Sequence, residues 1–322
     1  MNIQSLQDRL WQKPKRIVFT DGLNVSVLQA ARQLSDKGWA KPIVVGSPLR
    51  IHELAEQHKL RLHGVSVKKP IHDPNFDAYS RFYRKNVETG LSYATAREKL
   101  QQPLYYAALM VKHGQADLII APAEEHLDEL LQVERIFSEE KPFVSASGVI
   151  WDESSEAVFV FADVLINARP DAQGLARIAA DSASTFGKLS GQPAKVAMLS
   201  FSTMGSAEHP RVQTVRDAVR ILRDEHPELD VEGELQFDAA LVPEIQKKKA
   251  PQSSLGGSAN VFVFPSLNAA DPGFKIVQSL TSFNTAGPFL QGLQIPLQWL
   301  PPDADAEQII TQVIIASSLL NA

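Results

Sequence analysis

The chain of 322 residues contains no cysteine. Disulfide bonds, a thiolate nucleophile and a zinc ion held by thiolates are therefore excluded. The eight histidines are scattered, and no two of them are separated by three residues. Because that spacing is the one that puts two imidazoles on one face of a helix, we expect no dedicated metal site.

Long apolar runs and a basic surface are also lacking. No segment approaches the roughly 18 apolar residues of a membrane-spanning helix, and the polar N-terminus lacks the apolar core of a signal peptide. The net charge is −5, whereas a general nucleic-acid binder needs a basic face to neutralise phosphates. The sequence therefore predicts a cytoplasmic protein that binds neither membranes nor nucleic acid.

The chain does contain a repeated alternation of short apolar segments and longer amphipathic ones. Apolar segments at 16–20, 41–47 and 116–123 alternate with helical patterns, of which the longest runs through 95–115. A second series begins near residue 142, with two strands around a turn at 152–155. Such alternation predicts parallel sheets covered by helices. Since no flexible linker separates the two series, we expect two halves that pack directly around a cleft.

The segment 196–210 carries the most specific local signal. An apolar strand pattern, "VAMLSF", is followed by "STMGSA" and then by a helical pattern from Arg211. The hydroxyls of this loop could donate to an anion, with Gly205 allowing a close approach of the backbone. The alternative is that serine and threonine cap the next helix and glycine makes the turn. The hydroxyl-bearing residues are Ser202, Thr203 and Ser206.

Clusters of charged residues are weaker candidates for a functional site. Glu234 and Asp238 are four residues apart and would share one face of a helix, as an acid–base pair or as a solvated face. The acidic segment 124–129 contains His126 and could indicate a metal, but the first turn of a helix explains it equally well. The lysines at 247–249 are either solvated or meet an anionic ligand, such as a nucleotide-bearing cofactor.

Several long segments together resemble the phosphate acetyltransferase family, also called phosphotransacetylases. They are 196–210, 231–245, 249–280 and 286–297, with 16–31, 90–123 and 159–183 upstream. The family includes phosphate butyryltransferases and the C-terminal domain of large malic enzymes. The likeness extends over nearly the whole chain, from the first strand pattern to the last helix.

This resemblance implies a fold and a reaction. The fold has two α/β domains with parallel-type sheets flanked by helices, the second domain inserted in the first. We expect 1–141 with 293–322 to form the first domain and 142–292 the second, with the active site in the cleft. The family moves an acetyl group between coenzyme A and phosphate, so acyl-CoA, acyl phosphate and phosphate are the expected ligands. A homodimer without a metal or tightly bound cofactor is also implied.

The resemblance further implies which residues line the cleft. In the middle of the chain these residues belong to the hydroxyl-rich loop and to three later motifs. The ligand-binding candidates are Ser202, Thr203, Gly205, Ser206, Asn260, Gly287, Pro288 and Gln291.

Several positions that carry catalytic groups in the family hold other residues here. The arginine and lysine of the family motif R-x-H-K-G fall on Asn86 and Thr89. The serine, threonine and arginine of H-S-T-A-D-T-x-R fall on His126, Leu127 and Gln132.

The last family motif departs in the same way. The serine and arginine of D-L-S-R-G fall on Pro301 and Pro302, and the acidic residue that follows falls on Gln308. The loop position that is often lysine is Met204. Three arginines elsewhere could substitute for the missing cations, namely Arg81, Arg84 and Arg135.

These departures favour a homologue that binds acyl-CoA or acyl phosphate while its catalysis is weakened or lost, as in a regulatory or ligand-sensing protein. The alternative is an active phosphate acyltransferase that uses displaced residues. For the homodimer, the last helical segment has more hydrophobic surface than one packing face requires. We therefore expect that helix to contribute to a dimer contact.

Overall fold

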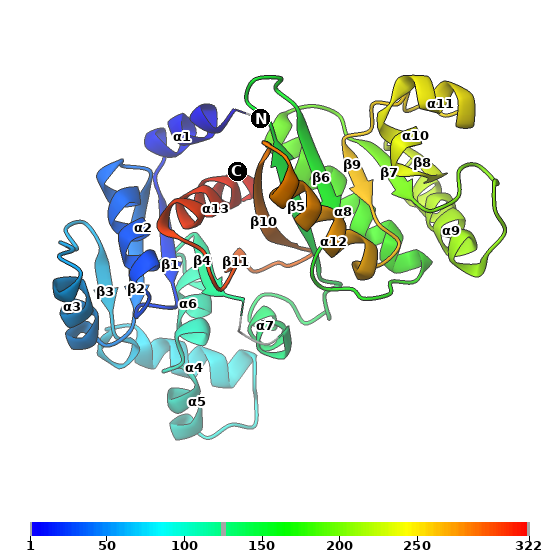
Figure 1. The fold of residues 1–322 in the computed structure, drawn as a ribbon. Helices are drawn as coiled ribbons and strands as arrows, with labels where there is room; N and C mark the ends of the chain where they lie inside the picture. Colours follow the sequence, from blue (N-terminus) through cyan, green and yellow to red (C-terminus); the bar gives the residue numbers. More distant parts are fainter. Residues whose placement is uncertain (1, 124–126, 321–322) are drawn as a thin grey trace. The chain divides into compact units, whose positions relative to one another are not determined.

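The computed structural model describes residues 2–123 and 127–320. The hypotheses made for Glu124, Glu125 and His126 lie outside these described residues. The chain forms two compact units, shown in Figure 1. The terminal unit contains Ile3–Pro142 and Leu293–Ala322, and the middle unit contains Phe143–Gly292.

The terminal unit is built on a five-stranded parallel sheet with the order β11-β4-β1-β2-β3. Its inner strands are short runs rich in valine, isoleucine and leucine whose side chains are mostly buried on both faces. Such runs are typical of a parallel sheet with helices on both sides. The strands are β1 (Lys15–Phe19), β2 (Ala40–Val45), β3 (Ser66–Lys68), β4 (Leu118–Pro122) and β11 (Leu297–Leu300).

The helices of the terminal unit connect these strands. They are α1 (Ile3–Gln12), α2 (Val25–Asp36), α3 (Pro48–Gln57), η1 (Pro70–His72), α4 (Phe76–Asn86), α5 (Tyr93–Lys99), α6 (Pro103–Lys112), α7 (Leu127–Glu134) and α13 (Ala306–Leu319).

The single long helix predicted for 95–115 is wrong, because α5 and α6 are separate helices. The break lies at Gln102, whose backbone is extended, and Pro103 is the first residue of α6. A residue before proline is pushed out of the helical conformation, and proline itself cannot donate a helical hydrogen bond. A favourable apolar pattern therefore does not continue the helix through this point.

The last helix, α13, packs on α1 and α2 within the terminal unit, as predicted. Residues Ile309 and Val313–Ala316 are buried there. The expectation that this helix has hydrophobic surface to spare for a dimer contact is therefore wrong. Packing against two helices, rather than one, covers the second apolar face.

The middle unit contains a six-stranded mixed sheet with the order β10-β5-β6-β9-β7-β8. β5 pairs antiparallel with both β6 and β10, and the other neighbours are parallel. The predicted turn between β5 and β6 is present, and Asp152 accepts the N–H groups of Ser154 and Ser155 in it. The strands are β5 (Ser145–Trp151), β6 (Val158–Ala162), β7 (Lys195–Leu199), β8 (Asp230–Leu235), β9 (Val261–Val263) and β10 (Asn284–Gln291).

Helices α8 and α12 cover opposite faces of this sheet at β5. Ser147 bonds to Gln291, which in turn bonds to Thr185 of α8. The next residue, Gly148, lies against Phe274 of α12, and an added Cβ would be 2.4 Å from that ring. Successive residues of a strand point to opposite faces. The helices of this unit are α8 (Ala172–Ser190), α9 (Pro210–Glu225), α10 (Phe237–Leu241), α11 (Pro243–Lys249) and α12 (Leu267–Leu280).

Within the two described ranges, no helix is long and apolar enough to cross a bilayer.

Candidate functional site

The carboxyl edge of the parallel sheet in the terminal unit is hollowed. β11, β4 and β1 are parallel neighbours that end at this edge, and a cavity of about 80 Å³ lies beyond their ends. The chain leaves β1 toward β2 on one side, while β4 lies on the other side. Open α/β sheets bind ligands at such a reversal of strand order. The lining includes Asp21, Asn24, Pro122, Leu300, Pro301 and Pro302.

This cavity has an unusual chemical lining for an anion site. Among the residues that the structure describes, none of those lining the cavity is cationic, and Asp21 is the only one that titrates. The side-chain oxygen of Asn24 accepts the N–H groups of Ser26 and Val27 at 2.9 and 3.3 Å, which starts α2. The prolines at 301 and 302 have no backbone N–H to donate. The described lining of the cavity therefore supplies no cationic side chain for a phosphate.

Gln308, the position at which the resemblance predicts the family's acidic residue, takes part in a helix cap. Its backbone N–H donates to Asp305 Oδ1 at 2.8 Å, and its side-chain oxygen accepts the Asp305 N–H at 2.9 Å. This reciprocal capping box satisfies two N–H groups at the start of α13. The role of Gln308 visible in the structure is thus to begin a helix.

Two of the three substitute arginines lie on α4 near Asn86. Asn86 is the exposed last residue of this helix, and its amide donates to the carbonyl of Phe82 at 2.9 Å. Arg81 and Arg84 are exposed on the same helix. Neither forms a hydrogen bond or ion pair with another residue in 2–123 or 127–320. Their guanidinium groups are free to reach a ligand.

Gln132 lies on α7, where its side-chain oxygen accepts the Tyr105 hydroxyl at 2.6 Å. Lys99 Nζ lies 3.3 Å from the same oxygen. Sequence analysis did not single out Lys99, but its charge is next to the position on which a family arginine falls. Arg135 follows α7 and is exposed. These contacts join α5, α6 and α7 through side chains that are far apart in the sequence.

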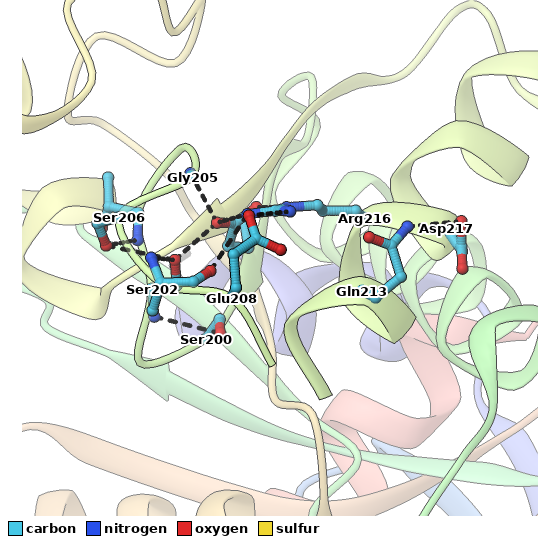
Figure 2. A network of polar contacts seen from close by, with 11 residues as sticks. Ser200, Ser202, Gly205, Ser206, Glu208, Gln213, Arg216 and Asp217 are labelled. Carbon is cyan, nitrogen blue, oxygen red and sulfur yellow. Dashed lines mark hydrogen bonds and ion pairs between the residues drawn. The ribbon is translucent and has the colours of Figure 1, made fainter. Parts of the chain in front are cut away.

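In the middle unit, the loop 202–206 follows β7 and closes around a carboxylate of the chain itself. Glu234, on β8, accepts the Ser202 hydroxyl at 2.8 Å and the Gly205 N–H at 2.9 Å, both on Oε1. Arg216, on α9, donates from Nε to Oε2 at 2.8 Å and from Nη2 to Oε1 at 3.2 Å. Figure 2 shows Ser202, Gly205 and Arg216 of this network, with dashed lines for the contacts between the residues drawn.

The backbone donors of this loop are all used inside the chain. Ser206 Oγ accepts the Thr203 N–H at 3.0 Å, and Ser202 Oγ accepts the Ala207 N–H at 3.0 Å. The N–H groups of Ser202, Met204 and Ser206 donate to Ser200 Oγ, the Glu234 carbonyl and the Thr203 carbonyl. The anion that occupies this cradle is therefore the Glu234 side chain.

The alternative function for these hydroxyls, capping of the next helix, is wrong. α9 begins at Pro210, and its cap is His209, whose Nδ1 accepts the Arg211 N–H at 3.1 Å. The loop is too far back in the sequence to reach the free N–H groups of this helix, because capping side chains act two or three residues ahead.

Glu234 stays ionised although its side chain is only 2% exposed. Burial opposes the charge, but the hydrogen bonds from Arg216, Gly205 and Ser202 outweigh it and lower the pKa of Glu234 to about 2. The hydrogen bond to Glu234 raises the pKa of Arg216. Both partners are charged at neutral pH, so the network is a permanent ion pair.

The predicted pairing of Glu234 and Asp238 on one helix face is wrong. Glu234 belongs to β8, and the following helix, α10, starts only at Phe237. Asp238 instead pairs with Lys249 of α11 at 2.8 Å. The segment 231–235 alternates apolar and polar residues, which is the signal of a strand rather than of a helix.

A chain of polar contacts leads from the loop to one of the three lysines. Thr203 Oγ1 accepts the Gln236 N–H at 3.0 Å and donates to the Gln236 side-chain oxygen at 3.3 Å. Lys249 Nζ donates to that oxygen at 3.0 Å. Lys249 therefore helps to hold α11 beside the loop. Lys247 and Lys248 are exposed and have no partner among the described residues.

The other residues predicted to bind a ligand do not lie beside the loop 202–206. Asn260 precedes β9 and accepts the Lys195 N–H at 2.7 Å, at the amino end of β7, whereas the loop follows the carboxyl end of that strand. Gln291 is buried and bonds to Ser145, Ser182, Ser147 and Thr185. These four hydrogen bonds engage both the oxygen and the N–H₂ group of the Gln291 amide. Gln291 therefore links β10, β5 and α8.

Gly287 and Pro288 lie at an irregularity of β10, where the pairing with β5 shifts between Ala286 and Phe289. Gly287 has φ +119°, and an added Cβ would be 2.8 Å from the Ser147 carbonyl oxygen. Only glycine fits this position. The structure thus explains this motif by strand packing.

Comparison with known proteins agrees with the fold and with the resemblance read from the sequence. The family model described as phosphate acetyl/butaryl transferase matches residues 1–317. The chain belongs to this family, as the sequence motifs predicted. Phosphate acetyltransferase from Bacillus subtilis is 38% identical over 319 residues, which cover 98% of this chain and 97% of that protein. The phosphate acetyltransferase of Thermoanaerobacterium thermosaccharolyticum is 34% identical, with 99% of each chain covered.

Two solved structures of phosphotransacetylases also resemble this chain. The EutD phosphotransacetylase from Staphylococcus aureus has a TM-score of 0.90 at 32% identity, covering 99% of this chain and 98% of that one. A phosphotransacetylase from Streptococcus pyogenes has a TM-score of 0.87 at 34% identity, with the same coverage. The predicted α/β fold class of phosphotransacetylases is confirmed.

Proposed function

We propose that this protein is an active acyltransferase that moves an acetyl group between coenzyme A and phosphate. One observation carries the proposal: the chain matches proteins named phosphate acetyltransferase at 34–38% identity over 98–99% of its length. In the proposed reaction, the CoA thiolate attacks the carbonyl carbon of acetyl phosphate. A carbon–sulfur bond forms, the carbon–oxygen bond to phosphate breaks, and phosphate leaves with the bonding electrons. The proposed compartment is the cytoplasm predicted from the sequence.

This chemistry sets demands on the protein. Negative charge builds up on the carbonyl oxygen and on the leaving phosphate, so charged hydrogen-bond donors are needed at both places. The Ser202–Ala207 backbone is engaged with Glu234 and with itself, so we propose that only the outer side of this loop contacts CoA. Phe201, which is 59% exposed, and the exposed Ser206 are available there.

A second candidate function is binding of acyl-CoA or acyl phosphate with weakened catalysis. It is favoured by the pair Pro301 and Pro302, which line the cavity and donate no backbone hydrogen bonds. Loss of about 4 kcal/mol of transition-state stabilisation would lower turnover roughly 10³-fold. Substrate binding away from these prolines would survive.

One assay separates the two candidates. For the active transferase, we expect purified protein to form acetyl-CoA from acetyl phosphate and CoA at about 1–10³ turnovers per second, the usual range for enzymes. The rate is followed through a coupled assay that consumes acetyl-CoA, with butyryl phosphate as a parallel substrate. Reactions that lack CoA, and a mock preparation from cells without the gene, serve as controls. Turnover at or below about 10⁻² per second would favour the binding homologue.

We also propose a homodimer, with a contact face that differs from the one predicted from the sequence. Ile276 and Leu280 on α12 are 57% and 79% exposed, and Phe283 follows them at 36%. Neighbouring exposed apolar side chains of this size are typical of an interaction surface.

Light scattering at micromolar concentration should therefore give about twice the chain mass of 35.4 kDa. Leu280→Asp should shift the mass toward the monomer, because an unpaired charge in an apolar contact is costly. Leu49→Asp, at a 69% exposed leucine of the terminal unit, is the matched control. A wild-type monomer, or a dimer unaffected by Leu280→Asp, would contradict this assignment.

A further inference from the structure

Four side chains from three helices and a loop meet around Lys99 in the terminal unit. Tyr83 comes from α4, Glu88 from the loop that follows it, Tyr105 from α6 and Gln132 from α7. Lys99 itself ends α5. Because Lys99 and Gln132 alone are 33 residues apart in the sequence, the convergence of these side chains is a product of the fold and not of local sequence.

The contacts hold the lysine ammonium group in one place. Lys99 Nζ donates to Glu88 Oε1 at 2.5 Å and to Gln132 Oε1 at 3.3 Å. It also lies 4.9 Å from the centre of the Tyr105 ring and 5.6 Å from that of Tyr83. A cation above aromatic rings is attracted to their faces. Lys99 is therefore positioned on several sides, unlike a lysine that moves freely in solvent.

The acceptors around the lysine are themselves oriented. Tyr83 donates to Glu88 Oε1 at 2.8 Å, and Tyr105 donates to Gln132 Oε1 at 2.6 Å. Burial opposes the charge on Glu88, but hydrogen bonds from Lys99 and Tyr83, together with the charge of Arg135, keep its pKa below the usual value. Glu88 is thus a charged partner that holds Lys99 toward Gln132.

Donors remain unused at this point. An ammonium group has three N–H donors, and the described partners of Lys99 take two of them. The side-chain N–H₂ group of Gln132 and the guanidinium group of Arg135 have no hydrogen-bond partner within the described residues. Arg135 directly follows α7, three residues after Gln132, and its side chain is exposed.

The charges around the cluster are not all positive. Glu129 lies one turn before Gln132 on α7, and its charge acts on Tyr105. Arg135 directly follows the end of α7, three residues after Gln132. The groups with unused donors thus include two cations, Lys99 and Arg135, besides the Gln132 amide. Partly exposed donors of this kind, with 21% of the Lys99 side chain accessible, suit an oxyanion.

We propose that Lys99, the Gln132 amide and Arg135 bind the phosphoryl group of acetyl phosphate or the free phosphate of the reverse reaction. Glu88 is the ion-pair partner of Lys99, and its charge competes with the phosphoryl group for the ammonium group. This inference deepens the proposed acyltransferase function and rests on it.

The test compares three variants in steady-state kinetics. Lys99→Met removes the ammonium group but keeps the length of the side chain, and should raise KM for acetyl phosphate about tenfold or more. The KM for CoA should change less than about twofold. Lys112→Met is the matched control, because Lys112 also lies over a ring, 5.2 Å from the centre of Phe137, and should leave both constants unchanged.

The third variant separates ligand binding from a structural ion pair. Glu88→Gln removes the same ion pair as Lys99→Met, keeps the acceptor for Tyr83, and leaves the ammonium group in place. Because it removes a competing negative charge, it should lower KM for acetyl phosphate, by about threefold. If Glu88→Gln and Lys99→Met impair the enzyme alike, or if Lys99→Met raises KM for CoA instead, the proposal is overturned.

A measurement of phosphate binding tests the proposed site without relying on enzymatic turnover. Titration calorimetry with inorganic phosphate should show affinity weakened about tenfold or more in Lys99→Met and in Arg135→Met, and unchanged in Lys112→Met. If the wild-type protein binds phosphate in this way without forming acetyl-CoA, the transferase proposal fails and the phosphate site stands. If it forms acetyl-CoA and neither constant changes in Lys99→Met, the site is wrong and the transferase stands.

Discussion

We expect Glu234→Gln to loosen the loop 202–206 and to lower the free energy of unfolding of the middle unit by about 2–3 kcal/mol. The carboxylate accepts four donor groups, from Ser202, Gly205 and twice from Arg216. An amide of the same shape has one accepting oxygen, and its N–H₂ group must face one of these donors. At least one donor then loses its partner in a place where the side chain is 2% exposed.

Urea unfolding measures the loss of stability, and hydrogen exchange of the amides of 202–207 measures the loosening. The matched control is Glu208→Gln, since Glu208 also contacts Arg216, at 3.4 Å, but is 85% exposed. An exposed ion pair contributes little, so this variant should change stability by less than about 0.5 kcal/mol. Equal effects of the two variants would rule out a special role for Glu234.

The same variant should also change the response to acid. The pKa of Glu234 falls from an ordinary value of 4.5 to about 2 in the folded state. A lowered carboxyl pKa stabilises the folded state fully above its unfolded pKa, and this contribution is lost as pH falls through the folded pKa. The stability difference between the wild type and Glu234→Gln should therefore be constant above about pH 5 and shrink toward pH 2.

The second large effect is expected for Gly257→Ala, which should cost the middle unit about 3 kcal/mol or more. Gly257 has φ +69°, and an added Cβ would lie 2.5 Å from both the N and the Cα of Pro243. These are backbone atoms at the first residue of α11, so they cannot rotate away as a side chain could. The substitution therefore combines backbone strain with a clash.

Gly256→Ala is the control for this prediction. Gly256 has nearly the same φ, +67°, but the nearest atom to its added Cβ is 4.0 Å away. It should cost only the strain of a left-handed backbone, about 1–2 kcal/mol. Urea unfolding followed by circular dichroism compares the two. If both substitutions cost the same, the close approach to Pro243 has no energetic consequence.

Much of the fold could be predicted from the sequence because its signals are local. The β-branched runs at β1, β2 and β4, and the helical spacing in α2 and α8, indicate a layered α/β architecture with parallel strands. The turn at Asp152 was recognisable for the same reason, since its side chain bonds within three residues. Where a local signal was missed, as at Pro103, the information was present in the sequence, and the proline should have outweighed the apolar pattern.

The sequence by itself thus determined the family and the pattern of strands and helices. Only the tertiary structure decided what fills the space around those motifs. Glu234 lies 29–32 residues from its partners in the loop, and Lys99 lies 33 residues from Gln132. No periodicity links residues so far apart, because their meeting depends on how strands and helices pack. The contact of the loop with Glu234 and the contact of Lys99 with Gln132 are therefore properties of the fold.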